Sequence, residues 1–186
     1  MSTPPLSRRL FLLSGSVCAA VPLWAQTPNA GWREAVAGLK TRGTHHFRYW
    51  GLSIYHAELQ VATGFEPARF ALHRLALGLT YTRSLKGLAI ADRTISEMQT
   101  LAQRNGQSWE PARVASWQRQ LRALIPDVQA GDRITGVNQP MQGVALFLNE
   151  VALGTVQGAD FAELFFGIWL SSQSPQPTMR QALLAL

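Results

Sequence analysis

Apolar and polar residues alternate along the first half of the chain, a pattern typical of β-strands. The alternation covers residues 44–50 and, after a glycine, residues 52–61, and both stretches are rich in aromatic and β-branched residues. Such a pair predicts either one bent strand or two paired strands around Gly51. A turn is expected at 64–69, and residues 70–83 are again predicted to be extended, with apolar residues at every second position towards their end.

The period of the pattern changes to that of a helix in the middle of the chain. Apolar residues within 88–104 fall in one helical arc and polar residues on the other side, which predicts an amphipathic helix. Pro111 is expected to open a second helix, which Pro126 ends. A third helix, over 161–170 and capped by Asp160, is apolar nearly all round, so we expect it to be buried between a sheet and other helices.

The remaining pattern completes one domain. Two short apolar stretches, 144–148 and 151–156, flank a two-residue turn and predict a tight β-hairpin. A last short helix is expected at 178–186. There is no internal repeat or second domain, so residues 26–186 are predicted to form a single α+β domain with an antiparallel sheet covered on one face by helices.

The first 25 residues have the parts of an export signal. Arg8 and Arg9 precede the apolar stretch 10–13, a run of small residues follows, and Ala25 stands at a suitable cleavage site. The apolar stretch is too short for a membrane span, which needs ~20 residues, so we expect residues 1–25 to be removed and the mature protein to be periplasmic. The paired arginines fit twin-arginine export as well as ordinary secretion, and the sequence leaves both routes open.

Export and composition exclude several classes of function. Cys18 is the only cysteine and lies within the signal, so the mature chain has no disulfide, thiolate nucleophile or cysteine metal site. No glycine-rich phosphate loop is present, and we expect no cofactor. Loss of the signal lowers the basic count from 17 to 15 against 11 acids, and thus the formal net charge from +6 to +4. Because the remaining arginines are scattered singly, nucleic acid is not an expected partner.

The histidines and serines form no familiar catalytic or metal-binding pattern. His45 and His46 are neighbours in a predicted strand, so their side chains point to opposite faces and cannot share a metal. His56 and His73 have no partner at metal-ligand spacing in the sequence. No Gly-x-Ser-x-Gly motif is present to support a hydrolase triad. The sequence therefore predicts histidines on the surface or on a sheet face, and no metal site.

Arginines are the more informative charged residues. Arg83 continues the alternation of the apolar face that includes Tyr81, so its guanidinium is expected at the end of that face, against water, a carboxylate or an anionic ligand. Arg42 precedes Gly43 at the start of the first strand. Each arginine can equally be a surface residue whose stem packs on apolar neighbours. Glu97 borders the apolar arc of the first helix, either as a solvated flank or as the partner of one of these arginines.

A series of short segments extends in order over nearly the whole mature chain: 42–44 (RGT), 50–59 (WGLSIYHAEL), 79–87 (LTYTRSLKG), 96–98, 126–128, 131–134, Asn149 with Gly154-Thr155, and 161–170. In this order and spacing they resemble the chalcone isomerase-like family, in its bacterial exported branch. The resemblance implies an open-faced β-sandwich, in which a large antiparallel sheet packs against a layer of helices with a cleft between them. It also implies two uses of that cleft, since the family's plant enzymes close a chalcone into a flavanone and related plant proteins bind fatty acids.

In both uses an arginine lies at the cleft, and the resemblance places it at Arg42. In the enzymes it holds the oxyanion that forms as the ring closes, and in the binders it pairs with the ligand's carboxylate. The enzymes' threonine falls at 48–49, their tyrosine and asparagine fall near Ile90 and Glu97, and a further hydroxyl residue falls near Leu164. This chain lacks those residue types at most of these positions, which argues against isomerase activity.

The sequence therefore predicts an exported binder of a small amphipathic, anionic ligand such as a fatty acid. The residues expected to contact the ligand are Arg42, Arg83, Tyr81, Tyr49 and Glu97. One alternative is an intramolecular lyase in which Arg42 stabilises an enolate. Another is a scaffold without a ligand whose surface binds an envelope protein. The sequence does not specify the oligomeric state.

Overall fold

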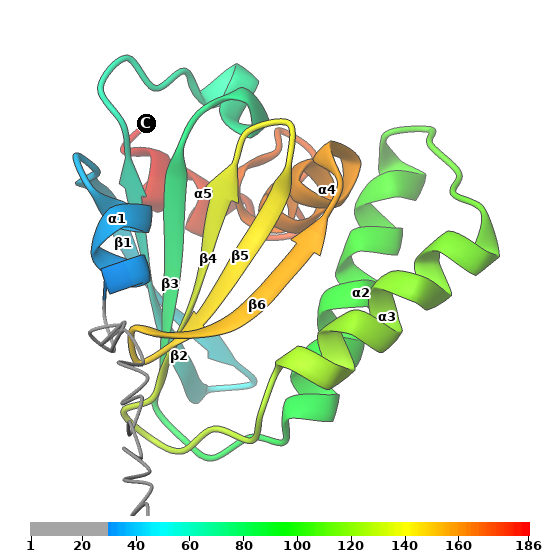
Figure 1. The fold of residues 1–186 in the computed structure, drawn as a ribbon, viewed down its shortest axis with the longest axis horizontal. Helices are drawn as coiled ribbons and strands as arrows, with labels where there is room; N and C mark the ends of the chain where they lie inside the picture. Colours follow the sequence, from blue (N-terminus) through cyan, green and yellow to red (C-terminus); the bar gives the residue numbers. More distant parts are fainter. Residues whose placement is uncertain (1–29) are drawn as a thin grey trace, which may run out of the picture.

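Six strands, each paired with the next along the chain, form one antiparallel sheet in the computed structural model, which describes residues 30–186 (Figure 1). The export signal expected at 1–25 lies outside the described residues. The strands are β1 (Lys40–Tyr49), β2 (Leu52–Val61), β3 (Leu75–Tyr81), β4 (Arg133–Gln139), β5 (Gly143–Leu148) and β6 (Val151–Gln157). This order confirms the predicted antiparallel sheet and the hairpin of β5 and β6, and of the two alternatives left open around Gly51 it shows the pair of strands, β1 and β2.

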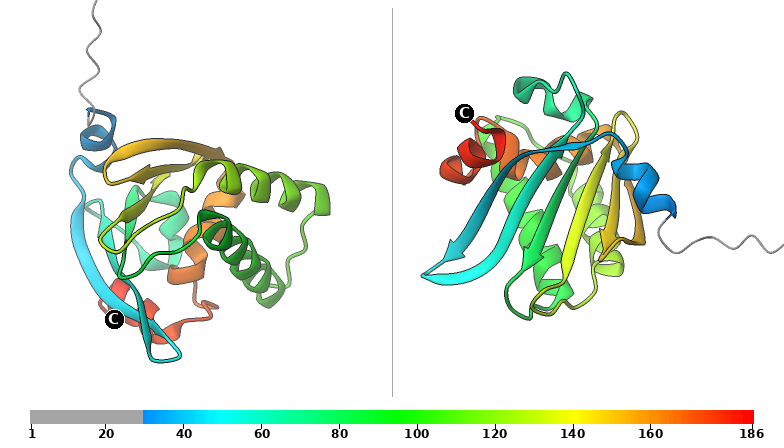
Figure 2. Two further views of the ribbon diagram at one scale, coloured as in Figure 1. Left: turned by 90° about the horizontal axis from the view of Figure 1, so that it is seen from below. Right: turned by 90° about the vertical axis from the view of Figure 1, so that its left-hand side faces the viewer.

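The helices lie on both faces of the sheet but mostly on one (Figure 2). A long pair inserted between β3 and β4 and a second pair after β6 cover the inner face, whereas the N-terminal helix packs on the outer face. They are α1 (Ala30–Val36), the 3₁₀ helix η1 (Pro67–Leu72), α2 (Gly87–Arg104), α3 (Pro111–Leu124), α4 (Ala159–Leu170) and α5 (Pro177–Leu184). The result is the open-faced arrangement of sheet and helices that the resemblance implied.

The nearly all-apolar helix, α4, lies at the centre of the core as predicted. Phe161 and Phe166 have no exposed surface, and each residue from Phe161 to Leu170 except Glu163 is buried. Gly167 allows α2 to approach closely, because a Cβ at this position would lie 2.5 Å from Cδ2 of Leu101. The closely packed helices α2 and α4 form one wall of a cavity.

Some local predictions were wrong. The stretch predicted to be extended from residue 70 begins as the end of η1, and β3 starts only at Leu75. The helix predicted to begin at Phe161 starts two residues earlier, at Ala159, with Gly158 at its N-cap. Asp160 therefore lies in its first turn, where its carboxylate pairs with Arg113. Neither α1 nor β4 was predicted.

No helix within residues 30–186 is both long and apolar enough to cross a bilayer.

Candidate ligand-binding cavity

A cavity of about 300 Å³ lies between the strands β1–β3 and the helices α2 and α4. This volume is at the lower end of the range of about 300–1,000 Å³ typical of small-molecule sites. Most of its wall is apolar, and the aliphatic and aromatic side chains that form it include Phe47, Ile54, Leu79, Leu85, Ile90 and Ile168. Such a wall favours an apolar ligand or the apolar part of an amphipathic one.

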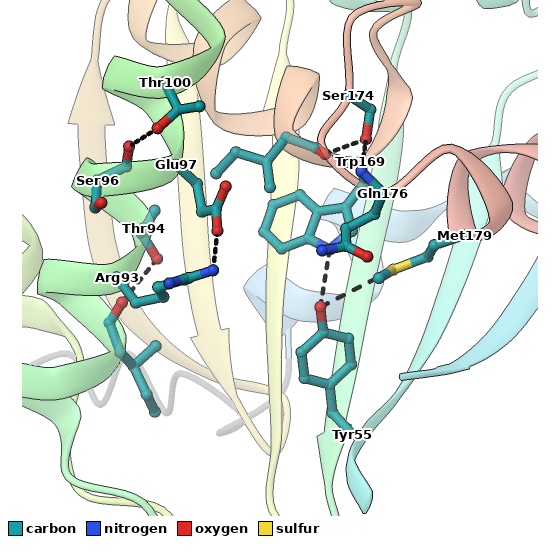
Figure 3. A network of polar contacts seen from close by, with 12 residues as sticks. Tyr55, Arg93, Thr94, Ser96, Glu97, Thr100, Trp169, Ser174, Gln176 and Met179 are labelled. Carbon is teal, nitrogen blue, oxygen red and sulfur yellow. Dashed lines mark hydrogen bonds and ion pairs between the residues drawn. The ribbon is translucent and has the colours of Figure 1, made fainter. Parts of the chain in front are cut away.

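Tyr55, on β2, is held in place by a hydrogen-bond network. Its hydroxyl accepts a hydrogen bond from Nε1 of Trp169 at 3.2 Å and donates one to Sδ of Met179 at 3.9 Å (Figure 3). Burial raises the pKa of Tyr55 to about 12, and the nearby Glu97 carboxylate also raises it, whereas the bond from Trp169 lowers it. Tyr55 is therefore a neutral residue that joins the sheet to α4 and α5.

Tyr81, on β3, provides a hydroxyl that has no such network. Its side chain is 4% exposed, lines the cavity and contacts the ring of Tyr55 edge-on, with ring centroids 6.1 Å apart. Burial raises the pKa of Tyr81, and the nearby Tyr55 raises it as well. Within residues 30–186 the Tyr81 hydroxyl has no hydrogen-bond partner. Because Tyr81 lines the cavity, this unpaired hydroxyl is available to form a hydrogen bond with a ligand.

The charged part of the cavity is an ion pair on α2. Arg93 and Glu97 are four residues apart, so their side chains meet on one helix face, and they form a salt bridge. The Glu97 side chain is 15% exposed and that of Arg93 is 63% exposed, so the carboxylate lies deeper than the guanidinium. Figure 3 shows this pair on the α2 side, opposite Tyr55 and Trp169. Among the residues that line the cavity, Arg93 is the only lysine or arginine.

A family model described as chalcone isomerase-like matches residues 51–185. The chain belongs to the chalcone isomerase-like family. Among solved structures, the fatty-acid binding protein of Arabidopsis thaliana has a similar fold, with a TM-score of 0.63 and 8% identity over 80% of this chain and 87% of that one. An uncharacterized protein of Haemophilus influenzae is 28% identical over 110 residues. That match covers 59% of this chain, and the chain spans about half the length of that relative.

Three of the five residues expected at the ligand line the cavity of this chalcone isomerase-like domain. Tyr49 and Tyr81 do so from β1 and β3, and Glu97 does so from α2. Arg42 and Arg83 are not among the lining residues. The structure therefore brings the predicted tyrosines and the carboxylate together but places both predicted arginines elsewhere.

Arg42 and Arg83 each lie outside the cavity lining for a local backbone reason. The pairing of β1 with β2 shifts by one residue between Thr41 and Gly43, so Arg42 occupies a bulge and leaves the alternation of the strand. Its Nε donates a hydrogen bond to the carbonyl oxygen of Leu184 at 2.9 Å, which ties β1 to the end of α5. The strand β3 ends at Tyr81, so its alternation does not extend to Arg83, which is exposed.

Sequence reasoning missed Arg93, the arginine that does line the cavity. Glu97 was expected either at a solvated flank or beside an arginine of the strands, but its partner is on its own helix. The four-residue spacing between Arg93 and Glu97 was the signal that could have identified this pair.

A second missed feature lies on the outer face of the sheet. His46 and His56 have no partner by sequence spacing, yet they are direct neighbours across β1 and β2, with stacked rings 4.1 Å apart. Nε2 of His46 lies 2.5 Å from Oγ of Ser53. No group of three histidine, cysteine or acidic residues within 30–186 is arranged to hold a metal ion.

Of the positions Ile90, Glu97 and Leu164, near which polar residues of the family's enzymes fall, two lie at the cavity. Ile90 and Glu97, near which the tyrosine and asparagine fall, both line the cavity. Leu164 does not, and it is buried beside Ile95 and Met98. Where the family's enzymes have hydroxyl and amide groups, this chain therefore presents an aliphatic side chain and a carboxylate to the cavity.

Proposed function

We propose that this protein is an exported binder of a small amphipathic, anionic ligand such as a fatty acid, with the ligand in the cavity between β1–β3, α2 and α4. The observation that supports the proposal most directly is the lining, which is mainly apolar and includes one cation, Arg93. The name of the Arabidopsis thaliana protein of similar fold supports the same ligand class. Export is supported by the sequence of residues 1–25 alone.

The two parts of such a ligand contribute in different ways. Each CH₂ of the tail that is buried against the apolar wall stabilises the complex by ~0.8 kcal/mol. The head group interacts with Arg93, whose guanidinium already pairs with Glu97. A ligand carboxylate is attracted by Arg93 and repelled by Glu97. Because the Arg93 side chain is 63% exposed, we expect its contribution to be well below that of a buried ion pair.

Calorimetric titration with dodecanoate and with dodecanol tests this assignment, since the two ligands share a tail and differ in the head group. Arg93→Met keeps an unbranched side chain and removes the charge, so it should weaken dodecanoate binding about 2- to 5-fold and leave dodecanol binding unchanged. Glu97→Gln should strengthen dodecanoate binding, because it removes the repelling charge at nearly constant shape. Tyr81→Phe tests whether the unpartnered hydroxyl bonds to the head group, in which case binding weakens.

Arg42→Met and Arg83→Met are the matched controls, because neither arginine lines the cavity. Both should bind dodecanoate as the unchanged protein does. Equal affinity for the acid and the alcohol in the unchanged protein would contradict an anionic ligand. Weaker dodecanoate binding by Arg42→Met, with no effect of Arg93→Met, would instead show that Arg42 binds the carboxylate, as the resemblance implied.

We also propose that the cavity does not cyclise chalcones. The support is the presence of Ile90 and Glu97 near the positions of the enzymes' tyrosine and asparagine. The rate of flavanone formation should equal the uncatalysed rate in a spectrophotometric assay. A stereospecific flavanone formed faster than background, and lost in Arg93→Met or Arg42→Met, would favour the lyase instead.

A further inference from the structure

Within residues 30–186, the turn between β1 and β2 has more exposed large apolar side chains than either of the other two hairpin turns of the sheet. Trp50 is 89% exposed, Leu52 is 55% exposed and Tyr49 is 52% exposed, and these are three of the eight large apolar side chains that are exposed within residues 30–186. Figure 2 shows this end of the β1–β2 hairpin projecting beyond the other strands. We call residues 48–52 the hairpin tip.

Tryptophan is an unusual residue for this turn. Trp50 has φ +51° and Gly51 has φ +78°, and a two-residue turn with two positive φ angles favours Asn-Gly or Gly-Gly. A bulky side chain in this region of φ is disfavoured. Because the indole is almost fully exposed, packing within residues 30–186 does not offset that cost. An external partner for Trp50 would account for both observations.

The charge around the hairpin tip is positive. Arg48 lies beside it on β1, and Arg83 is close because Oγ1 of its neighbour Thr82 is 2.9 Å from Oγ of Ser53. Both arginines are exposed, and neither forms a salt bridge within residues 30–186. Tryptophan and tyrosine favour the interface between water and bilayer, and arginines beside them favour anionic lipid.

We propose that the hairpin tip docks the protein onto the surface of an anionic phospholipid bilayer, with Trp50 and Leu52 inserted and Arg48 and Arg83 against the head groups. Three apolar side chains are too few for a typical protein interface, to which each partner contributes about 20–30 residues. They are enough for shallow insertion into a bilayer. The hairpin tip also adjoins the cavity, since Tyr49 and Ile54 line it. Docking would thus bring the cavity next to a phase in which amphipathic molecules dissolve.

Co-sedimentation with vesicles tests docking without any knowledge of the cavity ligand. The full chain should bind vesicles of phosphatidylglycerol mixed with phosphatidylcholine more tightly than vesicles of phosphatidylcholine alone, and less tightly as salt increases. Trp50→Ala should weaken binding about tenfold or more. Arg83→Gln should weaken binding to the anionic vesicles about fivefold and leave binding to the neutral ones unchanged.

Met141→Ala is the matched control, because Met141 is also an exposed apolar turn residue, 73% exposed and with positive φ, but lies in the β4–β5 turn at the opposite end of the sheet. It should bind as the unchanged protein does. All variants share residues 1–29, so any vesicle binding through that segment is equal in all of them. Quenching of tryptophan fluorescence by brominated lipid should fall in Trp50→Phe.

Equal vesicle binding by the unchanged protein, Trp50→Ala and Arg83→Gln overturns the proposal. A second outcome also overturns it: the unchanged protein does not bind vesicles, self-associates in sedimentation velocity, and becomes monomeric in Trp50→Ala. The hairpin tip would then bind a second copy of the chain. Because Trp50 and Arg83 are outside the cavity, vesicle docking can fail while dodecanoate still binds, and the reverse also holds.

Discussion

Replacement of Trp50 by asparagine is expected to stabilise the protein, although it removes a large apolar side chain. Positive φ brings the Cβ of a non-glycine residue close to the following carbonyl oxygen and costs about 1–2 kcal/mol, whereas the short polar side chain of asparagine tolerates this conformation. Trp50 has φ +51° and is 89% exposed, so the substitution relieves the backbone and loses little buried surface. Asn-Gly is also the preferred pair for a turn of this type.

The size of the effect follows from how often each residue adopts this conformation. Asparagine is enriched several-fold at positive φ, which corresponds to about 0.5–1 kcal/mol. In a domain of about 150–250 residues, 1 kcal/mol shifts the melting temperature by about 2–4 °C. Trp50→Asn should therefore raise the melting temperature by about 1–4 °C and raise the urea midpoint without a change in m-value.

Two further variants separate the backbone from the side chain. Trp50→Ala retains the unfavourable φ and loses only the contact with the Tyr49 ring, at 6.2 Å between centroids, so its stability should be near that of the unchanged protein. Gly51→Ala should lower the free energy of unfolding by about 1–2 kcal/mol, because φ is +78°. No steric clash adds to this cost, since an added Cβ meets nothing within 4 Å. If Trp50→Asn and Trp50→Ala both lower the melting temperature, the indole itself stabilises the hairpin and the reasoning is refuted. A stabilised Trp50→Asn that no longer binds vesicles would instead show that tryptophan serves docking at the expense of stability.

Three other predictions concern packing and titration. Gly87→Ala should destabilise the domain by about 1–3 kcal/mol in urea unfolding, because its Cβ would lie 2.2 Å from the carbonyl oxygen of Ile125. Tyr55 should titrate with a pKa of about 12 by ultraviolet absorbance, and its contribution to stability should be complete below pH 10 and be lost as pH rises through 12. Asp92, which accepts hydrogen bonds from Arg122, should titrate with a pKa of about 2 by NMR, so its contribution is present above its ordinary pKa of 3.8 and is lost as pH falls through 2. Arg122→Gln should return that pKa towards 3.8.

Most elements around the cavity were predictable because they bury one face. Alternation identified most of β1 and β2, and the 3.6-residue period identified α2, whereas α4 was identified because it is apolar nearly all round. The strand β4 was not predictable in this way, since both of its faces are covered and its residues from Ile134 to Asn138 are all buried. The one buried amide side chain of β4, Asn138, donates from Nδ2 to the carbonyl oxygens of Ala71 and His73.

The side chains that point into the cavity were predictable only where the backbone is regular. Tyr49 and Tyr81 follow the alternation of their strands, and Glu97 follows the helical arc. Arg42 lies in a bulge, and Arg83 lies beyond the end of β3. Bulges and strand ends depend on pairing between distant segments, which the local pattern of apolar residues does not contain.

The arginine of the cavity lies on α2 and not, as expected, on a strand, and this difference alters how the cavity can hold an anion. Arg42 does not line the cavity, and its Nε donates to the Leu184 carbonyl oxygen at the end of α5. Arg93 lines the cavity, and its guanidinium has five N–H donors, of which one carboxylate engages at most two in the bidentate geometry. Arg93 can therefore keep Glu97 and accept a second carboxylate. Glu97 then fixes the orientation of the guanidinium and limits affinity by repulsion, which is why Arg93→Met and Glu97→Gln are expected to change dodecanoate binding in opposite directions.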